Sequence, residues 1–484
     1  MNTPRLFSIT AAGVASGLPR QVAVVGATSM VKSGRKLTGV SKQREPPSTT
    51  AMISKVLHGA LQQANLTVRD LDGLVAVPSL QGDHFMEAHY QATALGLFGN
   101  GQEPRALRCR TLDTGGAGPV SALLEAERMI QAEGLECVAV VAADAVGSMS
   151  SETFLSKADD IFFKLGKTLG QPEGSVKSPA IPHGYDRITQ FQMKNYDLKR
   201  IQLQMAVSLE SYHASLHPDS LHSQKSDAAF NPVKDDQQST QSQSRYYSSY
   251  TTLEQVQSST PVTPNISLLE CARRADGAAC LILASNRFLQ RRNVWAPGIP
   301  VVIGGGAFSG PLYPPQNPDH ITDVMYASCQ QAMTRAYASA GNLCAKDIHF
   351  FGLYDCFPIC LVRAIEACGL SPIGEGGKYL EIQHQRLVAA LESDADDTTS
   401  GIRKGGAVES LLMDPSFFPI NTHGGLLCFG APWEVPAMFN IVEAVDQLRG
   451  RARGRQIHGC RRALVFGNGG VLSASAVAIL ATSS

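Results

Sequence analysis

The chain reads Arg108-Cys109-Arg110-Thr111-Leu112-Asp113-Thr114-Gly115-Gly116-Ala117-Gly118-Pro119-Val120-Ser121 where a strand-like segment ends in a glycine turn and a helix begins. The helix is predicted from about Val120 to Gln131, because apolar residues recur there at helical spacing. A glycine turn at the start of a helix directs backbone N–H groups outward at the positive end of the helix dipole. Such a turn suits an oxyanion or a nucleophile, yet between Thr114 and Val120 it contains only Gly, Ala and Pro. The sequence therefore indicates a site whose reactive side chain is absent.

The composition is that of an ordinary globular protein. A length of 484 residues predicts two or three domains. Lys plus Arg equals Asp plus Glu at 42 each, which argues against a general affinity for nucleic acid. The 11 cysteines lack Cys-x-x-Cys spacing, so neither a zinc or other metal site nor a disulfide framework is expected. The longest apolar runs are strand-sized, so no transmembrane helix is predicted.

The N-terminus is basic, and its first acidic residue is Glu45. Residues 1–20 are rich in Ser, Thr, Ala and Arg, which is the composition of an organelle transit peptide. A mitochondrial location is the expectation that follows, with a cytosolic or peroxisomal location as the alternative. A plain basic arm before the first strand explains the same composition.

Five segments of the N-terminal part recur in the same order in the C-terminal part. They are a strand ending in glycine, a helix, a strand introduced by Asp, a helix preceded by Pro, and a buried strand. The first set occupies residues 22–27, 50–64, 70–77, 120–131 and 137–143, and the second 301–306, 322–340, 347–354, 438–445 and 463–466. The chain is therefore predicted to be two copies of a β-α-β-α-β unit. The continuous apolar strands predict largely parallel sheets covered by helices.

A longer region, residues 147–262, lies between the two copies. Helices are predicted at residues 186–195 and 198–213. Residues 214–262 are rich in Ser and Gln and offer too little apolar surface to offset the entropy of ordering them. We interpret this stretch as a disordered insertion in a loop domain.

Three further stretches carry polar residues or glycines at predicted strand ends. They are Tyr354-Asp355-Cys356-Phe357-Pro358, Asn421-Thr422-His423-Gly424-Gly425-Leu426-Leu427-Cys428-Phe429-Gly430-Ala431-Pro432, and Phe466-Gly467-Asn468-Gly469-Gly470. With the glycine turn and the internal repeat, they resemble the thiolase superfamily, and within it the sterol-carrier-protein-2 thiolases. Residues 263–271 and 276–279 also resemble the family's return strand after its loop domain. The resemblance covers about residues 21–484 without the Ser/Gln-rich insertion.

The resemblance implies an α/β fold with a five-layered α-β-α-β-α core made of two halves. Residues 21–146, completed by 263–290, form the N-terminal half, 147–262 the loop domain, and 298–484 the C-terminal half. It also implies a tight homodimer and CoA thioesters as ligands, with no other cofactor. Thiolases run a Claisen reaction in which one Cys takes the acyl group, a His activates that Cys, a second Cys moves the α-proton, and oxyanion holes stabilise negative charge.

The chain departs from the family pattern at its reactive positions. The family's Cys-x-Ser-Gly falls on Gly115-Gly116-Ala117-Gly118, and its Gly-His-Pro falls on Gly430-Ala431-Pro432. The motif is therefore degenerate at Gly115, Ala117 and Ala431. A shift of one residue would place the nucleophile on Gly116, which is also glycine. Cys109 is no substitute, because it lies upstream on the predicted strand.

The remaining site residues follow from the same resemblance. The His-Asp-Cys-Phe of the sterol-carrier thiolases appears as Tyr354-Asp355-Cys356-Phe357, so Cys356 is kept as a proton donor while Tyr354 takes the place of the His. Asn421 is expected to hold a water or an oxyanion. The backbone N–H groups of Gly115, Gly469 and Gly470 are expected to bind a thioester oxygen. Other residues of these stretches are expected to be structural, namely Asp355, Cys360, His423 and Cys428.

The expected function is that of a thiolase-like acyl-CoA-binding protein of lipid or sterol metabolism, with little or no ordinary thiolase turnover. Chemistry that needs only an oxyanion hole and a proton donor remains open, such as decarboxylation of a malonyl-type thioester with protonation by Cys356. One alternative is a non-enzymatic acyl-CoA or lipid-binding protein. Another is an active 3-ketoacyl-CoA thiolase, an acyltransferase, that uses Cys356 as its nucleophile.

Overall fold

The computed structural model describes residues 21–34, 47–82, 84–99, 104–223, 250–315, 317, 320–321, 323–399 and 415–483. The predicted transit segment, residues 1–20, lies outside these ranges, as do residues 224–249 of the Ser/Gln-rich insertion. Within the ranges covered, no helix has an apolar stretch long enough to cross a membrane.

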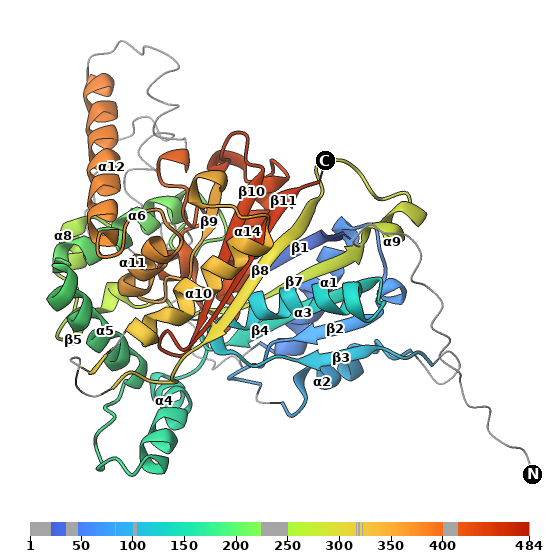
Figure 1. Ribbon diagram of the computed structural model, residues 1–484, viewed down its shortest axis with the longest axis horizontal. Helices are drawn as coiled ribbons and strands as arrows, with labels where there is room; N and C mark the ends of the chain where they lie inside the picture. Colours follow the sequence, from blue (N-terminus) through green and yellow to red (C-terminus); the bar gives the residue numbers. More distant parts are fainter. Residues whose placement is uncertain are drawn as a thin grey trace, which may run out of the picture.

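Strands and helices alternate through both halves of the chain (Figure 1). The strands are β1 Val22–Lys32, β2 Gly73–Ala76, β3 Arg108–Thr111, β4 Cys137–Ala145, β5 Pro261–Thr263, β6 Ile266–Ser267, β7 Asp276–Ser285, β8 Pro300–Ser309, β9 Phe350–Gly352, β10 Arg462–Gly469 and β11 Ala474–Thr482. The α-helices are α1 Thr49–Gln63, α2 Glu87–Ala94, α3 Gly118–Ala132, α4 Ser151–Thr168, α5 Ala180–Tyr196, α6 Arg200–Ser215, α8 Leu253–Gln257, α9 Asn286–Arg291, α10 Asp323–Ser339, α11 Pro358–Ala367, α12 Gly376–Thr399 and α14 Pro436–Leu448.

The main sheet has the strand order β3-β2-β4-β7-β1-β8-β11-β10-β9 and is mixed. The pairs β3–β2, β2–β4 and β10–β9 are parallel, whereas β4–β7, β7–β1, β1–β8, β8–β11 and β11–β10 are antiparallel. The prediction of largely parallel sheets is therefore wrong. A continuous apolar run indicates that a strand is buried on both faces, and this does not determine the direction of its neighbours.

The layers follow from the contacts of the helices. On the N-terminal part of the sheet, α1 packs on β1, β4 and β7, and α2 packs on β2 and β3. On the C-terminal part, α10 packs on β8 and β11. Helices α3 and α14 pack against each other and contact strands of both halves, including β4 and β10 for α3 and β1 and β10 for α14. This is the α-β-α-β-α arrangement that the sequence analysis predicted. The inserted helices α4, α5, α6 and α8 gather at one side of this core, beside α11 and α12 (Figure 1).

The repeat is visible in the backbone of β1 and β8. Each strand has an irregularity in its register, at Val24/Gly26 in β1 and opposite Ile479/Leu480 in β8. Each continues as a strand beyond its glycines, to Lys32 and Ser309, so the prediction that these strands end at the glycines is wrong. A Cβ on Gly26 would lie 2.1 Å from the Ala60 carbonyl oxygen of α1, and one on Gly304 would lie 2.7 Å from the Ala340 Cβ. The glycines allow the outer helix to approach the strand closely.

The Asp residues of the repeat also have equivalent places. Asp70 and Asp347 each end a 3₁₀ turn just before β2 and β9, respectively. The Asp70 carboxylate accepts a hydrogen bond from the Thr67 N–H at 2.8 Å, and Asp347 accepts one from the Cys344 N–H at 2.9 Å. The two halves therefore share the same local cap as well as the same order of elements.

The inserted segment confirms the two predicted helices as α5 and α6, which begin and end within a few residues of the expected positions. The ends of the Ser/Gln-rich range are ordered, contrary to the prediction for residues 214–262 as a whole. Thr252 caps α8, whose Val256 is fully buried, and β5 follows. A few buried apolar side chains and a cap are enough to order these short elements.

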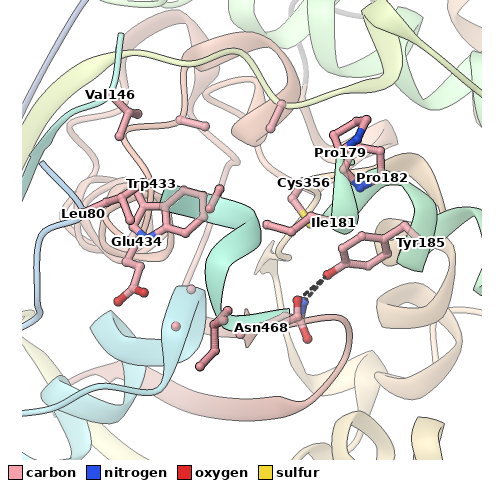
Figure 2. Close-up of a pocket in the computed structure, with 18 of the residues that line it drawn as sticks. Leu80, Val146, Pro179, Ile181, Pro182, Tyr185, Cys356, Trp433, Glu434 and Asn468 are labelled. Carbon is pink, nitrogen blue, oxygen red and sulfur yellow. Dashed lines mark hydrogen bonds between the residues drawn. The ribbon is translucent and has the colours of Figure 1, made fainter. Parts of the chain in front are cut away.

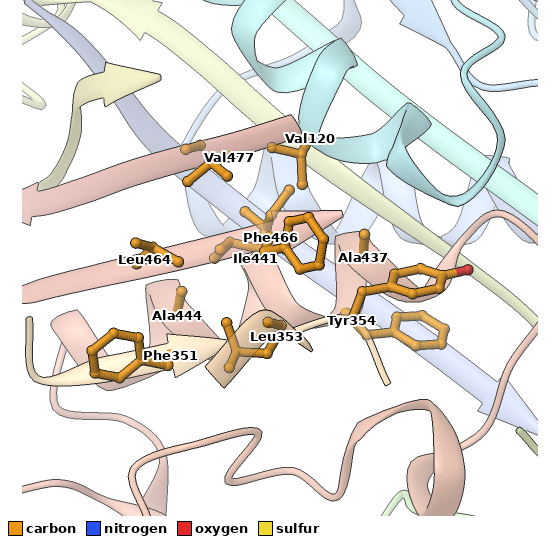
Figure 3. Packing of buried hydrophobic residues seen from close by; sticks show 14 of the residues in the cluster. Val120, Phe351, Leu353, Tyr354, Ala437, Ile441, Ala444, Leu464, Phe466 and Val477 are labelled. Carbon is orange, nitrogen blue, oxygen red and sulfur yellow. The ribbon is translucent and has the colours of Figure 1, made fainter. Parts of the chain in front are cut away.

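The core near β9 joins the two halves (Figure 3). Val120 of α3 lies near Phe466 and Val477 of β10 and β11, and Ile441 of α14 lies beside Phe466, in the same buried cluster as Phe351 of β9. All five of these side chains are essentially inaccessible to solvent. Because the beginning of α3 is held by strands of the other half, its position relative to β10 is fixed by the core.

Candidate functional site

A cavity of about 730 Å³ opens at the start of α3. The chain reaches it through a 3₁₀ turn, Gly115–Ala117, in which Gly115 has a left-handed φ of 58°. The glycines predicted to form the oxyanion site, Gly469 and Gly470, line the same cavity as Gly115. The structure thus brings together two glycine segments that lie more than 350 residues apart in the chain.

Apolar side chains of one helix line part of the cavity, here called the apolar wall, and polar groups of other segments line another part, here called the polar wall. Helix α4 provides the apolar wall with Phe154, Leu155, Ala158, Ile161 and Phe162. The polar wall consists of groups from several segments, namely Asp113, Tyr185, Tyr354, Cys356, Glu434 and Asn468. The predicted site residues Tyr354 and Cys356 are therefore both in the cavity, and so is Ala431.

Two backbone positions leave almost no room for side chains. A Cβ on Gly116 would lie 2.1 Å from the Tyr354 hydroxyl oxygen and 2.4 Å from the Asn468 carbonyl oxygen. A Cβ on Gly115 would lie 3.0 Å from the Gly469 Cα. At Gly116 in particular, the tyrosine hydroxyl occupies the space into which a side chain would project. The steric exclusion is therefore strongest at Gly116, one residue after the position on which the family's nucleophilic Cys falls.

Tyr185 of α5 connects the polar wall to the second glycine segment. Its hydroxyl donates to the Gly470 carbonyl oxygen at 3.1 Å and accepts from the Asn468 Nδ2 at 2.7 Å (Figure 2). Burial, reinforced by the neighbouring Cys356 and Cys360, raises the pKa of Tyr185 well above its usual value. Burial likewise raises the pKa of Tyr354, so both phenols are neutral hydrogen-bond donors.

Asn468 is buried at 1% exposure, and its Oδ1 has no hydrogen-bond partner. The Gly115 N–H lies 3.4 Å from the Asp113 Oδ1, a long contact that a stronger acceptor can displace. An unsatisfied buried amide oxygen in a cavity wall is costly without a ligand or water. The site therefore offers an acceptor, the Asn468 Oδ1, and a weakly engaged donor, the Gly115 N–H, to a ligand at the predicted oxyanion position.

Sequence reasoning missed Glu434, which also lines the cavity. Its carboxyl oxygen Oε2 is buried without a hydrogen-bond partner. Burial, together with the negative charges of Asp113 and Asp144, raises the pKa of Glu434 to about 8, although a hydrogen bond with the Trp433 side chain opposes the shift. The available signal was a single acidic residue within the otherwise apolar run from Leu426 to Phe439.

Asn421 lies outside the cavity lining. It is fully buried, and its Oδ1 accepts from the Leu353 N–H at 2.8 Å. Its Nδ2 donates to the Leu353 carbonyl at 2.8 Å and to the Glu210 Oε1 at 3.1 Å. This amide therefore holds the end of β9, and its hydrogen-bonding groups face protein atoms.

The residues expected to be structural occupy buried positions. Asp355 accepts hydrogen bonds from the N–H groups of Leu426 and Leu427 at 2.8 and 3.2 Å. Burial raises the pKa of the Asp355 carboxyl to about 7. His423 lies in a turn, is 3% exposed, and its ring packs against Phe429.

The other cysteines considered above lie away from the turn. Cys360 and Cys428 are buried, and neither lines the cavity. Cys109 is half-buried on β3, upstream of the turn, and burial raises its pKa to about 11. None of these three thiols is therefore placed to replace the missing nucleophile. The cavity lining does contain two cysteines, Cys356 and Cys271, and burial raises the pKa of Cys271 to about 12.

Comparisons with known proteins agree with this architecture. A family model described as thiolase C-terminal domain-like matches residues 316–392 and 407–482. The bovine protein "Sterol carrier protein 2" is 29% identical over 212 residues, which are 44% of this chain and 34% of that protein. The matched region thus spans about a third of the length of that relative.

Solved structures cover almost the whole chain. The "Ltp2-ChsH2(DUF35) aldolase" has a TM-score of 0.66 at 19% identity, covering 96% of this chain and 99% of that one. Human mitochondrial 3-ketoacyl-CoA thiolase in complex with CoA has a TM-score of 0.61 at 14% identity, covering 96% and 98%. At these identities the structural likeness shows the fold, and the sequence matches cover less than half of the chain. Taken with the repeat and the glycine turn at α3, they show a chain that is similar to proteins of the thiolase superfamily and, among them, to the sterol-carrier-protein-2 thiolases.

Proposed function

We propose that this chain binds a CoA thioester in the cavity at the start of α3 and forms no acyl-enzyme there. The observation that carries the proposal is the turn itself, where Gly115 and Gly116 offer no side chain and the Tyr354 hydroxyl lies against Gly116. Ala431, which also lines the cavity, has no imidazole with which to activate a thiol. A site that has lost both nucleophile and base keeps little of a reaction that depends on their joint action.

The two walls of the cavity suit the two parts of such a ligand. The thioester carbonyl is placed near the Gly115 N–H, at the positive end of the α3 dipole. The apolar face of α4 then accepts the acyl group, which fits a role in lipid or sterol metabolism. One structural neighbour, the human 3-ketoacyl-CoA thiolase, was solved with CoA bound, which supports CoA as the carrier portion.

Chemistry through a thioester enolate remains available to this site. In a malonyl-type thioester, the bond between the α-carbon and the carboxylate breaks, and its electron pair becomes the enolate while CO₂ leaves. Backbone N–H groups hold the enolate oxygen, and a proton from Cys356 or another acid of the cavity completes the product. Hydrogen-bond donors preorganised around a developing oxyanion are a large source of rate acceleration.

Aldol cleavage is a second candidate, because it passes through the same enolate. A base removes the proton of the 3-hydroxyl group of a 3-hydroxyacyl thioester. The bond between C2 and C3 then breaks, C3 leaves as an aldehyde or ketone, and the electron pair of the broken bond forms the thioester enolate. Its support is the tyrosine hydroxyl that lies beside the glycine turn, together with the likeness to the solved structure of the Ltp2-ChsH2(DUF35) aldolase. Neither reaction requires an acyl-enzyme.

Mass spectrometry of the intact chain after incubation with acetyl-CoA tests the central claim. We expect no mass increase, whereas an acetyl adduct on Cys356 would instead support the alternative of an active thiolase. Titration calorimetry with acyl-CoA measures binding. Turnover is then assayed with acetoacetyl-CoA plus CoA, malonyl-CoA and a 3-hydroxyacyl-CoA. Binding without any turnover would support the non-enzymatic alternative, and absence of binding would contradict the proposal.

The assembly and location remain predictions. The edge strand β3 leaves one side of its backbone without a strand partner in the described part of the sheet, so pairing between two copies is available to a homodimer. Sedimentation velocity measures this directly. Sequencing of the mature N-terminus tests a mitochondrial transit segment, which predicts cleavage near Arg20.

A further inference from the structure

Glu434 occupies an unusual place for an acidic residue. It lies three residues after Ala431, in the segment that leads from the π-helical turn Gly425–Phe429 into α14. Figure 2 shows its carboxylate in the cavity on the side away from Tyr185, below the Trp433 ring. The segment that lacks the expected histidine therefore still delivers a proton-carrying group to the same cavity.

Among the residues that the structure describes, no cation pairs with the Glu434 carboxyl. Its Oε2 is buried and has no hydrogen-bond partner among them, while the carboxyl forms a hydrogen bond with the Trp433 side chain. The facing Asp113 and Asp144 carry negative charge, and the nearby Tyr354 is neutral. Asp144 is itself held by the N–H groups of the segment after β2, with 2.6 Å to the N–H of Leu80.

The two cations that line the cavity are engaged elsewhere. The Lys157 Nζ donates to the Leu80 carbonyl at 2.8 Å. The Arg274 guanidinium donates to the Met149 carbonyl and the Ser151 hydroxyl at 3.3 and 2.9 Å. Glu434 therefore holds its proton at neutral pH, and its raised pKa lies close to the pH at which an acid–base catalyst works best.

We propose that Glu434 is the acid–base catalyst of this site and moves a proton to and from the α-carbon of the bound thioester, in place of the imidazole missing at Ala431. The inference rests on the proposed function, because it requires a CoA thioester in the cavity. It assigns to one residue the proton transfer that enolate chemistry needs.

The proposed step is balanced without an oxidant or a reductant. The Glu434 carboxylate takes the α-proton, and the C–H electron pair becomes the enolate double bond. The carbonyl π-electrons move to the thioester oxygen, which the Gly115 N–H and its neighbours stabilise. In the reverse direction the protonated carboxyl returns its proton to the α-carbon, which is the half-reaction that decarboxylation or aldol cleavage requires.

Exchange of α-protons for deuterium measures this step without assuming the physiological reaction. Butyryl-CoA is incubated in D₂O with the full chain, and α-deuteration is followed by proton NMR. We expect Glu434→Gln to slow exchange by about 100-fold or more, since general acid–base groups contribute about 10²–10⁴-fold. Glu173→Gln removes an exposed carboxylate outside the cavity lining and is the matched control, with exchange as in the wild type.

The pH profile separates a catalyst from a structural residue. Asp113→Asn removes one of the charges that raise the pKa of Glu434, so the midpoint of the exchange profile should move to lower pH. Infrared difference spectra of wild-type and Glu434→Gln protein, without ligand, should show a protonated carboxyl at pH 7 that is lost with a midpoint near pH 8. An exchange profile whose midpoint is unchanged by Asp113→Asn would overturn the inference. So would infrared spectra in which no carboxyl signal depends on Glu434.

The outcomes distinguish the inference from the proposed function. If calorimetry detects no binding of butyryl-CoA or of the other thioesters, the proposed function fails, and the assignment of Glu434 fails with it. If the thioester binds but the wild type catalyses no exchange, only the assignment of Glu434 is overturned. The same holds if Glu434→Gln binds butyryl-CoA normally and exchanges at the wild-type rate.

Discussion

Replacing Gly116 with alanine tests whether the turn at α3 can accommodate any side chain. The added Cβ would lie 2.1 Å from the Tyr354 hydroxyl and 2.4 Å from the Asn468 carbonyl oxygen. To reach 3.0 Å, the hydroxyl must retreat by about 0.9 Å and the carbonyl by about 0.6 Å. The carbonyl belongs to the backbone of β10, where Asn468 is paired with Ser475 of β11, so it is the harder of the two to move.

The expected cost of Gly116→Ala follows from two opposing effects. Overpacking a close-packed site typically costs about 1–3 kcal/mol. Loss of glycine's freedom in the unfolded chain offsets about 0.4–1 kcal/mol of this. We therefore expect the free energy of unfolding to fall by about 1–2 kcal/mol. The backbone at Gly116 is outside the left-handed region, so steric contact is the cause rather than an unfavourable φ.

Urea unfolding followed by circular dichroism measures this change. The matched control is Gly454→Ala, at a glycine with nothing within 4 Å of a built Cβ and without a positive φ, which should be neutral or slightly stabilising. Combining Gly116→Ala with Tyr354→Ala removes the closer contact. The two changes should therefore cost at least about 0.5 kcal/mol less together than the sum of their separate costs.

Two results would refute the reasoning about the turn. One is an unfolding free energy for Gly116→Ala equal to that of the Gly454→Ala control. The other is strict additivity with Tyr354→Ala, because the tyrosine hydroxyl would then not be the group that excludes a side chain at position 116. Either result would reopen the question of whether a nucleophile fits at this turn.

Two other buried groups give further predictions. Tyr185→Phe removes the hydroxyl that binds the Asn468 amide, so it should cost about 1–3 kcal/mol of stability and weaken thioester binding, as urea unfolding and calorimetry will measure. Burial alone would raise the pKa of Glu443, but Arg455, with 2.9 Å between its NH2 nitrogen and the Glu443 Oε2, lowers that pKa to about 2. Because the folded-state value is depressed, the pair stabilises the fold above the unfolded pKa of about 4.3, and this contribution is lost as the pH falls toward 2. Glu443→Gln should cost about 3–5 kcal/mol at pH 7 and flatten the acid limb of a stability–pH curve, and an unchanged acid limb would rule out this pair as its source.

Much of the fold could be predicted from local patterns. Helical periodicity located α1, α3, α5, α6 and α10, and apolar runs located most of the strands that flank them. The repeat of Asp70 and Asp347 at equivalent strands was also readable, because a short cap depends on residues three positions apart. The direction of the strands could not be predicted, since β7 pairs with β1 and β4, and β11 pairs with β8, across long stretches of sequence. A buried strand has the same composition in either direction.

The candidate site divides in the same way. Cys356 and Tyr354 could be placed near the turn because family motifs occur at the ends of strands that meet there. Asn421 was expected to face the ligand, but its amide is used by the backbone of Leu353. Glu434 was overlooked because nothing adjacent to it in the sequence explains its raised pKa; that shift requires Asp113 and Asp144 to be nearby in space.

By itself, the sequence determined that positions 115 and 116 of the turn before α3 cannot carry an acyl group, because both residues are glycine and have no side chain. It also determined the internal repeat, which is a pattern along the chain. Only the tertiary structure decided that the Tyr354 hydroxyl lies against Gly116 and that Glu434 lines the cavity with a carboxyl oxygen, Oε2, that has no hydrogen-bond partner among the described residues. The physical reason is that side-chain exclusion and desolvation arise between atoms that approach in space, whereas the order of residues specifies only which atoms are available.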